Sequence, residues 1–257
     1  MRSILLATTA VFVALTSAAS AADLSLIPSG HITDSWTGLY VGGNVGYDKG
    51  TLEERPQTIG PNGPFADISP KGWSWGGQVG YNHQFGMLVV GLETDFQVSR
   101  GSGSRTINWT PKSGPKVYDF EYAWSESQTE RHGVKMPWFG TSRVRLGFTP
   151  WQSLLVYGTG GVAYGKITMS DEYEYSHSSP WYSYHYGSRT TTDRYGVGYA
   201  VGGGLEWAFA HNWTAKVEYL HLDLKIADMN MTSTYDSMFN STRATDELLR
   251  VGLNYKF

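Results

Sequence analysis

Eight segments of this chain alternate apolar and polar residues, and this alternation limits the fold more than any other feature of the sequence. A period of two residues is typical of β-strands that turn one face toward an apolar medium or core. Each segment also reaches the roughly 9 to 11 residues that a tilted strand needs to cross a membrane. The segments span residues 36–47, 73–85, 88–98, 137–148, 154–168, 195–209, 213–226 and 247–257.

The connections between these segments alternate sharply in length. Short turns are expected at 86–87, 149–153 and 210–212, and long polar loops at 48–72, 99–136, 169–194 and 227–246. The pattern predicts an all-β fold: an eight-stranded antiparallel transmembrane β-barrel with short periplasmic turns and long extracellular loops. An even strand count then places both mature termini in the periplasm. A soluble β-sandwich or lipocalin-like barrel is the alternative, but such folds are not expected to alternate loop length so regularly.

The composition agrees with a curved sheet. The chain holds 31 Gly, 17 Tyr, 10 Trp and 10 Phe in 257 residues, a mixture that disfavours helices and suits aromatic girdles at the membrane surfaces. A mean hydropathy below zero excludes a helical membrane protein. The net charge of −3 argues against a nucleic-acid binder. Because cysteine is absent, disulfides, thiolate metal ligands and a lipid-bearing Cys are excluded.

The N-terminus predicts export from the cytoplasm. Residues 1–21 combine basic Arg2, an apolar run and small residues up to Ala21, which is typical of a cleavable secretory signal. An uncleaved anchor is the alternative, but the apolar run is shorter than the roughly 20 residues of a membrane-spanning helix. We expect residues 22–35 to form a periplasmic linker and 36–257 to form the barrel.

The last strand shows how the two faces divide. Leu249 and Val251 fall on one face, while Arg250 and Asn254 fall on the other. The same division in the other strands directs eight charged side chains into the lumen: Glu93, Asp95, Arg143, Arg145, Glu206, Lys216, Glu218 and Arg250. An eight-stranded barrel is just wide enough to be filled by side chains, and buried charges are tolerated when paired. We therefore expect a lumen charge network, with a narrow ion path as the alternative.

One strand changes phase. In residues 213–226, Trp213 and Val217 share one face, whereas Leu220 and Leu222 lie at positions of the opposite parity. A β-bulge near Tyr219 or Leu220 is our interpretation of this shift.

Four motifs resemble a known family, the small alphaproteobacterial outer-membrane β-barrel proteins, which include surface antigens and haemin-binding members and are often labelled porin family proteins. The motifs are WTGLYVGG at 36–43, GTGGVAYG at 158–165, KVEY at 216–219 and RVGLNYKF at 250–257. The resemblance covers nearly all of the expected mature chain as strand order. It implies a surface antigen of the Gram-negative cell envelope.

The resemblance also implies partners. In such families the assembly machinery of the outer membrane recognises the final aromatic strand, which implies that Tyr255 and Phe257 form an assembly signal. A location in the bacterial outer membrane further implies contact with outer-membrane lipid and lipopolysaccharide.

The third long loop carries aromatic residues at alternate positions on both sides of a turn near Pro180. This pattern predicts a hairpin that continues beyond the membrane. His177, Trp181 and His185 are the candidate contacts for haemin or a host ligand. The alternative is that the aromatic residues form cross-strand pairs that hold the hairpin together. No cofactor and no metal site is predicted.

An enzyme is not expected. His221 and Asp223 share one face of a strand, but no spacing of a nucleophile and a base is diagnostic of catalysis. The sequence instead predicts a structural, surface-exposed outer-membrane barrel with a side-chain-filled lumen. Haemin or host-ligand binding through the loops, or a narrow porin-like channel, are the alternative functions.

Overall fold

The computed structural model of the protein describes most of the chain, except its N-terminus and parts of the four long connections. The described residues are 36–54, 68–109, 125–179, 181–226 and 242–257. The predicted signal peptide (1–21) and linker (22–35) lie outside them. In this described part of the chain, no helix is long and apolar enough to cross a bilayer.

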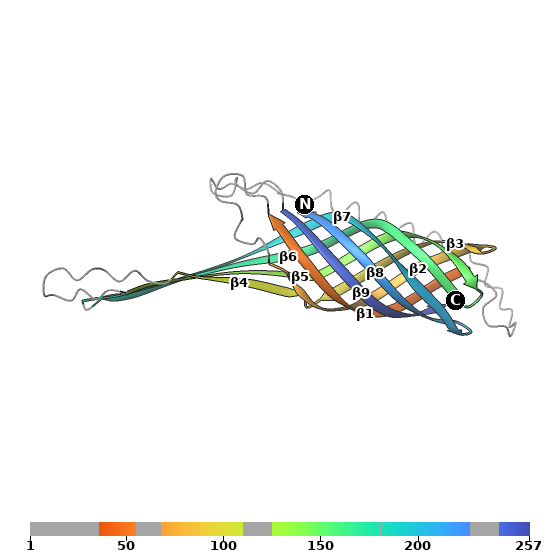
Figure 1. Cartoon of the computed structure of the whole chain (residues 1–257), viewed down its shortest axis with the longest axis horizontal. Helices are drawn as coiled ribbons and strands as arrows, with labels where there is room; N and C mark the ends of the chain where they lie inside the picture. Colours follow the sequence, from red (N-terminus) through yellow and green to blue (C-terminus); the bar gives the residue numbers. More distant parts are fainter. Residues whose placement is uncertain (1–35, 55–67, 110–124, 180, 227–241) are drawn as a thin grey trace. The chain divides into compact units, whose positions relative to one another are not determined.

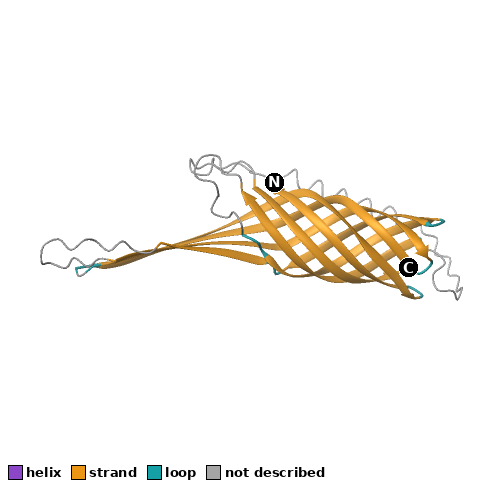
Figure 2. Ribbon diagram, in the orientation of Figure 1, coloured by secondary structure: helices purple, strands orange, loops and turns teal. Residues whose placement is uncertain are grey.

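Strands make up nearly all of the described residues (Figure 2). They are β1 (Gly38–Glu54), β2 (Lys71–Phe85), β3 (Leu88–Ser99), β4 (Ser102–Trp109), β5 (Ser125–Trp151), β6 (Leu154–Ser178), β7 (Ser183–Ala210), β8 (Trp213–Ile226) and β9 (Thr242–Lys256). The predicted all-β fold is confirmed, and β8 has the bounds that the sequence predicts.

The strands close into a ring with eight positions. Around the ring the order is β1-β9-β8-β7-β6-β5-β3-β2, and β2 pairs back with β1. The strand β4 follows β3 after a break at Arg100 and Gly101, and both strands pair with β5. Each of these pairs is antiparallel (Figure 1). The nine strands thus form the predicted eight-stranded antiparallel barrel.

Three short turns lie at one end of the ring, which we call the turn end. They join β2 to β3, β5 to β6 and β7 to β8. The β2–β3 turn consists of Gly86 and Met87, and Gly86 adopts a φ of 61°. Glycine fits this position because side chains with a Cβ disfavour positive φ. The short turns agree with the sequence prediction.

At the opposite end, four strands extend beyond the ring. The outer parts of these strands pair with one another and form a narrow sheet that we call the ribbon (Figure 1). The ribbon consists of β4, residues 125–135 of β5, residues 168–178 of β6 and residues 183–193 of β7. Much of residues 99–136 and 169–194 is therefore strand rather than loop. The hairpin predicted in the third loop is confirmed, since pairing continues to Ser178 and Ser183.

The β-bulge predicted near Tyr219 or Leu220 is wrong. The pairing of β8 with β9 is continuous from Trp213 to Ile226, and the irregularity on the other side of β8 lies between Ala208 and Ala210 of β7. No change of phase is needed because Leu220 and Leu222 point inward in register with Lys216 and Glu218. The lumen accepts apolar as well as polar side chains.

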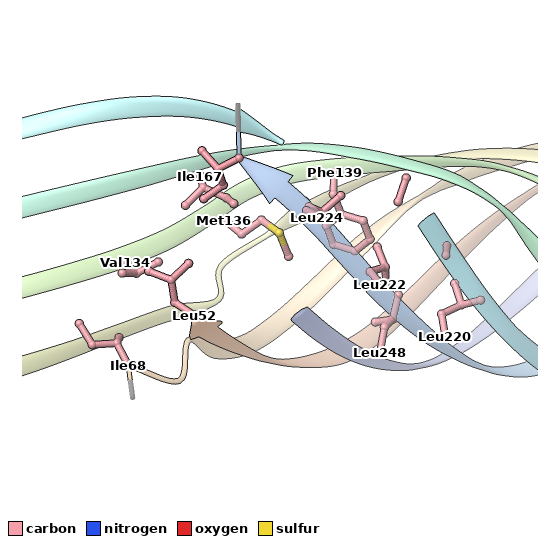
Figure 3. Close-up of a cluster of buried hydrophobic side chains, with 13 residues drawn as sticks. Leu52, Ile68, Val134, Met136, Phe139, Ile167, Leu220, Leu222, Leu224 and Leu248 are labelled. Atoms are coloured by element: carbon pink, nitrogen blue, oxygen red, sulfur yellow. The ribbon is translucent and has the colours of Figure 1, made fainter. Parts of the chain in front are cut away.

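The lumen therefore has three layers along its axis. At the ribbon end, a mouth cluster of buried apolar side chains includes Phe139, Leu220, Leu222 and Leu248 (Figure 3). At the turn end, a second cluster contains Trp36, Val89, Leu155, Tyr157 and Ala208. The eight inward charges lie between the two clusters along the strands that supply them.

The outer face of the ring is apolar. Exposed large apolar residues such as Leu92, Val144, Val197 and Val251 occur at alternate positions on most strands of the ring, and β6 contributes Val162. A continuous exposed apolar face of this kind on a closed barrel matches the lipid-facing surface of a membrane barrel.

Candidate functional site

The structure brings the eight predicted lumen charges together in one network, which we call the charge network. The members come from β3, β5, β7, β8 and β9: Glu93, Asp95, Arg143, Arg145, Glu206, Lys216, Glu218 and Arg250. Each residue is at most 2% exposed. Four acids face four bases, so the formal charges balance.

Glu93 is the centre of the charge network. Its carboxylate accepts hydrogen bonds from Arg143 at 2.7 Å and from the Lys216 ammonium at 2.9 Å to each oxygen. Arg145 and Arg250 approach the same carboxylate at 3.4 Å. Four cations thus converge on one anion, and the three arginines among them have further acidic partners that help to offset the cost of burying these charges.

The further partners are Asp95 and Glu218. Asp95 accepts from Arg143 at 2.8 Å and from Arg250 at 3.0 Å. Glu218 accepts from Arg143 at 3.1 Å and from Arg250 at 2.6 Å. The two guanidinium groups therefore bridge the same three carboxylates and link β3, β5, β8 and β9 across the lumen.

Arg145 extends the charge network toward the turn end. Its guanidinium donates to the Tyr40 hydroxyl at 2.6 Å and to Glu206 at 2.5 Å. It also lies 3.9 Å from the ring centre of Tyr157, in cation–π geometry. Glu206 in turn accepts from Asn254 at 2.7 Å, which joins β7 to β9.

The sequence did not single out Tyr157, because the glycines of that strand leave both faces plausible. Val156 and Val162, at even-numbered positions, face outward, so the odd-numbered Tyr157 faces inward. The Tyr157 hydroxyl donates to Glu218 at 3.0 Å, so this residue connects Glu218 with Arg145.

Little free space remains at the ribbon end of the lumen. A cavity of about 20 Å³ lies there, lined by residues that include Leu52, Val134 and Leu224. This volume holds about one water molecule. The arrangement favours a sealed, rigid core over a channel.

The ribbon separates two of the candidate ligand contacts, His177 and His185. His177 and His185 project from opposite faces, because His177 pairs with Tyr184 and Ser176 pairs with His185. His177 stacks on Tyr182 at 5.1 Å and on Tyr184 at 5.4 Å. The structure therefore does not bring the two histidines to one site.

The tip of the ribbon is aromatic and open. Trp181 is 81% exposed, and Tyr184 and Tyr186 are also exposed. Tyr184 pairs with Tyr175 at a ring distance of 5.6 Å, and hydrogen bonding to Tyr184 and Glu126 raises the pKa of the Tyr175 hydroxyl. Cross-strand aromatic pairs of this kind stabilise the ribbon itself.

His221 and Asp223, the two residues considered for catalysis, each bind a different partner. His221 lies 2.7 Å from Glu247, while Asp223 binds Arg243, so the two residues that share a strand face belong to separate pairs. In the described part of the chain, no three His, Asp or Glu side chains are placed to hold a metal ion.

The C-terminal strand ends in an outward aromatic cluster. The Tyr255 ring lies 5.2 Å from Trp213 and 5.3 Å from Phe257. The backbone N–H of Phe257 donates to the carbonyl of Leu39 at 2.9 Å, so the last residue is fixed to β1. These contacts place Tyr255 and Phe257 on the outer face at the turn end.

A closed antiparallel ring with an apolar outer face, a filled polar lumen and short turns at one end defines the class of outer-membrane β-barrel proteins. Comparison with known proteins identifies the family. The family model of the outer membrane protein beta-barrel domain matches residues 7–257, and the chain belongs to this family. It is accordingly a protein of the bacterial outer membrane.

The relatives are outer-membrane proteins of Brucella and Rhizobium. The 31 kDa outer-membrane immunogenic protein of Brucella melitensis is 35% identical over 239 residues, which cover 88% of this chain and 85% of that protein. The 22 kDa outer membrane protein of Rhizobium leguminosarum is 26% identical over 228 residues, covering 87% and 79%. The resemblance stated from the sequence motifs is confirmed.

Solved structures are more distant. The attachment invasion locus protein Ail of Yersinia pestis has 12% identity and a TM-score of 0.35, with 85% of this chain and 99% of Ail covered. Neisserial surface protein A has 13% identity and a TM-score of 0.35, with 86% and 98% covered.

Proposed function

We propose that this protein is a structural, surface-exposed barrel that does not conduct ions, does not catalyse a reaction and presents the ribbon outside the cell. The charge network carries this proposal. Its eight side chains meet across the lumen at ion-pair distances, and apolar clusters lie on both sides of it. An ion that enters would have to break several of these pairs at once.

Planar-bilayer recording tests the filled lumen. The refolded full chain should give no stable unitary conductance. A triple variant, Glu93→Ala/Arg143→Ala/Arg145→Ala, removes the centre of the charge network and should show measurable conductance, which proves that the assay detects an open lumen. Stable unitary currents from the unaltered protein would contradict the proposal.

The proposal includes an orientation, with the ribbon extracellular and both mature termini periplasmic. Short turns in the periplasm are the rule for outer-membrane barrels. The relatives named as immunogenic also fit a ribbon that is accessible at the cell surface.

Cysteine labelling tests this orientation cleanly because the chain has no native cysteine. A Ser179→Cys variant should react with a membrane-impermeant maleimide on intact cells. An Asn212→Cys variant at the turn end should react only after the outer membrane is permeabilised. The reverse pattern would show that the barrel is inserted the other way.

The exposed aromatic tip favours a second candidate function, the binding of haemin or a host ligand. Trp181 is free to stack on a planar ligand, whereas His177 would first have to leave its tyrosine neighbours. Haemin titration of the refolded barrel, followed by its Soret band, should separate the candidates. A shift that disappears in His177→Ala/His185→Ala would support binding, and an unshifted band would remove it.

A further inference from the structure

Four exposed basic side chains lie side by side on the outer face of the barrel, close to the ribbon. We call them the basic stripe: Lys49 of β1, Lys71 of β2, Lys135 of β5, and Arg100 at the break between β3 and β4. Lys49 stands directly opposite Lys71, and Ser102 stands between Lys71 and Lys135 in the same row. Arg100 lies next to this row at the strand break, where its backbone N–H donates to the Trp73 carbonyl at 3.0 Å.

Two lysines directly opposite each other repel, which destabilises a sheet unless an anion lies near them. Among the described residues, no ion pair involves any member of the basic stripe. Glu247 is the neighbour of Lys49 on its other side, but its carboxylate binds His221 and Tyr219. The basic stripe therefore presents positive charge to a ligand.

Three other outward cations at this end of the barrel are neutralised by acidic side chains of the protein. Lys166 lies 2.8 Å from Asp193, Arg131 lies 3.6 Å from Glu172, and Arg243 forms two hydrogen bonds with Asp223. These pairs lie on β5 to β9. The basic stripe differs from these three cations because Lys49, Lys71 and Lys135 lie in one row and form no ion pair among the described residues.

Aromatic side chains fix the depth of the basic stripe relative to the membrane. Tyr47 and Trp73 each lie two residues from a stripe lysine and contact each other edge to face at 5.6 Å. The Arg100 guanidinium lies 5.3 Å from the ring centre of Trp75. Since tyrosine and tryptophan occupy the interface between hydrocarbon and headgroups, the basic stripe lies at headgroup depth.

We propose that the basic stripe binds the phosphate groups of a phosphorylated glycolipid in the outer leaflet, while the acyl chains lie along the apolar outer face of β1, β2 and β3. This inference rests on the orientation proposed above. Adjacent strands are about 5 Å apart, so Lys49 and Lys71 reach one phosphate, while Lys135, roughly 10 Å from Lys71, reaches a second. Ammonium and guanidinium groups are the usual partners of phosphate oxygens.

Native mass spectrometry of the full chain in detergent tests this proposal, with bis-phosphorylated lipid A as the probe and dephosphorylated lipid A as its matched partner. The unaltered protein should retain the phosphorylated lipid preferentially. A Lys49→Gln/Lys71→Gln/Lys135→Gln variant should lose affinity by at least about tenfold, because each removed cation near the headgroups weakens phosphate binding.

The control removes the same charge elsewhere. A Lys166→Gln/Arg189→Gln/Lys225→Gln variant should keep its affinity, and heat-modifiable migration should show that both variants fold. Equal binding by the test variant, an equal loss in the control variant, or equal retention of dephosphorylated lipid would each overturn the proposal. Detergent exposes both ends of the barrel, so such a failure is distinct from a reversed orientation in the labelling experiment.

Discussion

Glu93 shows how a single carboxylate can organise a buried lumen. Lys216 has both of its described carboxylate contacts to this one group, whereas Arg143 and Arg250 also bind Asp95 and Glu218. Removal of the Glu93 charge would therefore leave Lys216 as the least compensated cation.

We expect Glu93→Gln to destabilise the barrel by about 3–5 kcal/mol, because an uncompensated buried charge remains. The measurement is urea unfolding of the refolded protein in lipid vesicles. A Glu93→Gln/Lys216→Met variant removes both charges and should recover part of the loss. Equal stability of Glu93→Gln and the unaltered protein would show that the charge network does not depend on this group.

Inward glycines make room for the two tyrosines that bracket Arg145. A Cβ atom at Gly80 would lie 2.3 Å from the Tyr40 hydroxyl, whereas a Cβ at Gly43, on the outer face, would meet nothing closer than 3.8 Å. Gly80→Val should thus displace Tyr40 and lower the unfolding midpoint, and Gly43→Val should be tolerated. The same urea unfolding experiment compares them, and equal midpoints would contradict the described lumen packing.

At the scale of the element, β8 carries two kinds of core on one face. Lys216 and Glu218 enter the charge network, and Leu220 and Leu222 enter the mouth cluster, with no break in register. The inward face of a strand is thus defined by geometry, and its chemistry changes along the barrel axis.

The assignment of Leu222 to the inner face and of Leu249 to the outer face can be tested with larger side chains at both positions. Leu222→Trp should cost about 1–3 kcal/mol or prevent folding, because the closed lumen has no space for a larger side chain. Leu249→Trp, on the outer face where Leu249 is 57% exposed, should be tolerated. Tolerance at Leu222 together with disruption at Leu249 would reverse our assignment of the two faces, and both outcomes are read from heat-modifiable migration and urea unfolding.

The sequence predicted the charge network well because a barrel strand has only two faces. Once Leu249 and Val251 are assigned to lipid, Arg250 must point inward, and the same parity locates Arg143 and Glu93. It failed at Leu220 because we expected a polar lumen throughout, so apolar residues in inward phase suggested a bulge. It also missed β4 and the outer part of β5, since these segments lack an apolar face that would distinguish them from an exposed loop, whereas the alternating aromatic residues of β6 and β7 did predict their hairpin.

At the scale of the whole molecule, the terminal strand closes the ring, and we propose that it also directs membrane insertion. The strand β9 pairs with both β1 and β8, and Phe257 is tied to Leu39. Loss of the last residue removes one hydrogen bond of the seam and one edge of the aromatic cluster with Tyr255.

Deletion of Phe257 should reduce insertion into the outer membrane without reducing export across the inner membrane, because the outward aromatic end of β9 is the proposed assembly signal. Cell fractionation with heat-modifiable migration measures both steps. Replacement by Phe257→Trp keeps an aromatic end and should preserve insertion. Unchanged amounts of folded barrel after the deletion would refute the proposal.

The ribbon and the barrel wall share three strands, and this gives the molecule a mechanical property. The strands β5, β6 and β7 run from the wall into the ribbon, and pairing from Thr168 to Ser178 extends it by about 35 Å at roughly 3.3 Å per residue. Inter-strand hydrogen bonds lie perpendicular to the strands, so tension applied near Trp181 loads many bonds together in shear. A force applied at the tip of the ribbon would therefore be transmitted through β5, β6 and β7 to the whole ring.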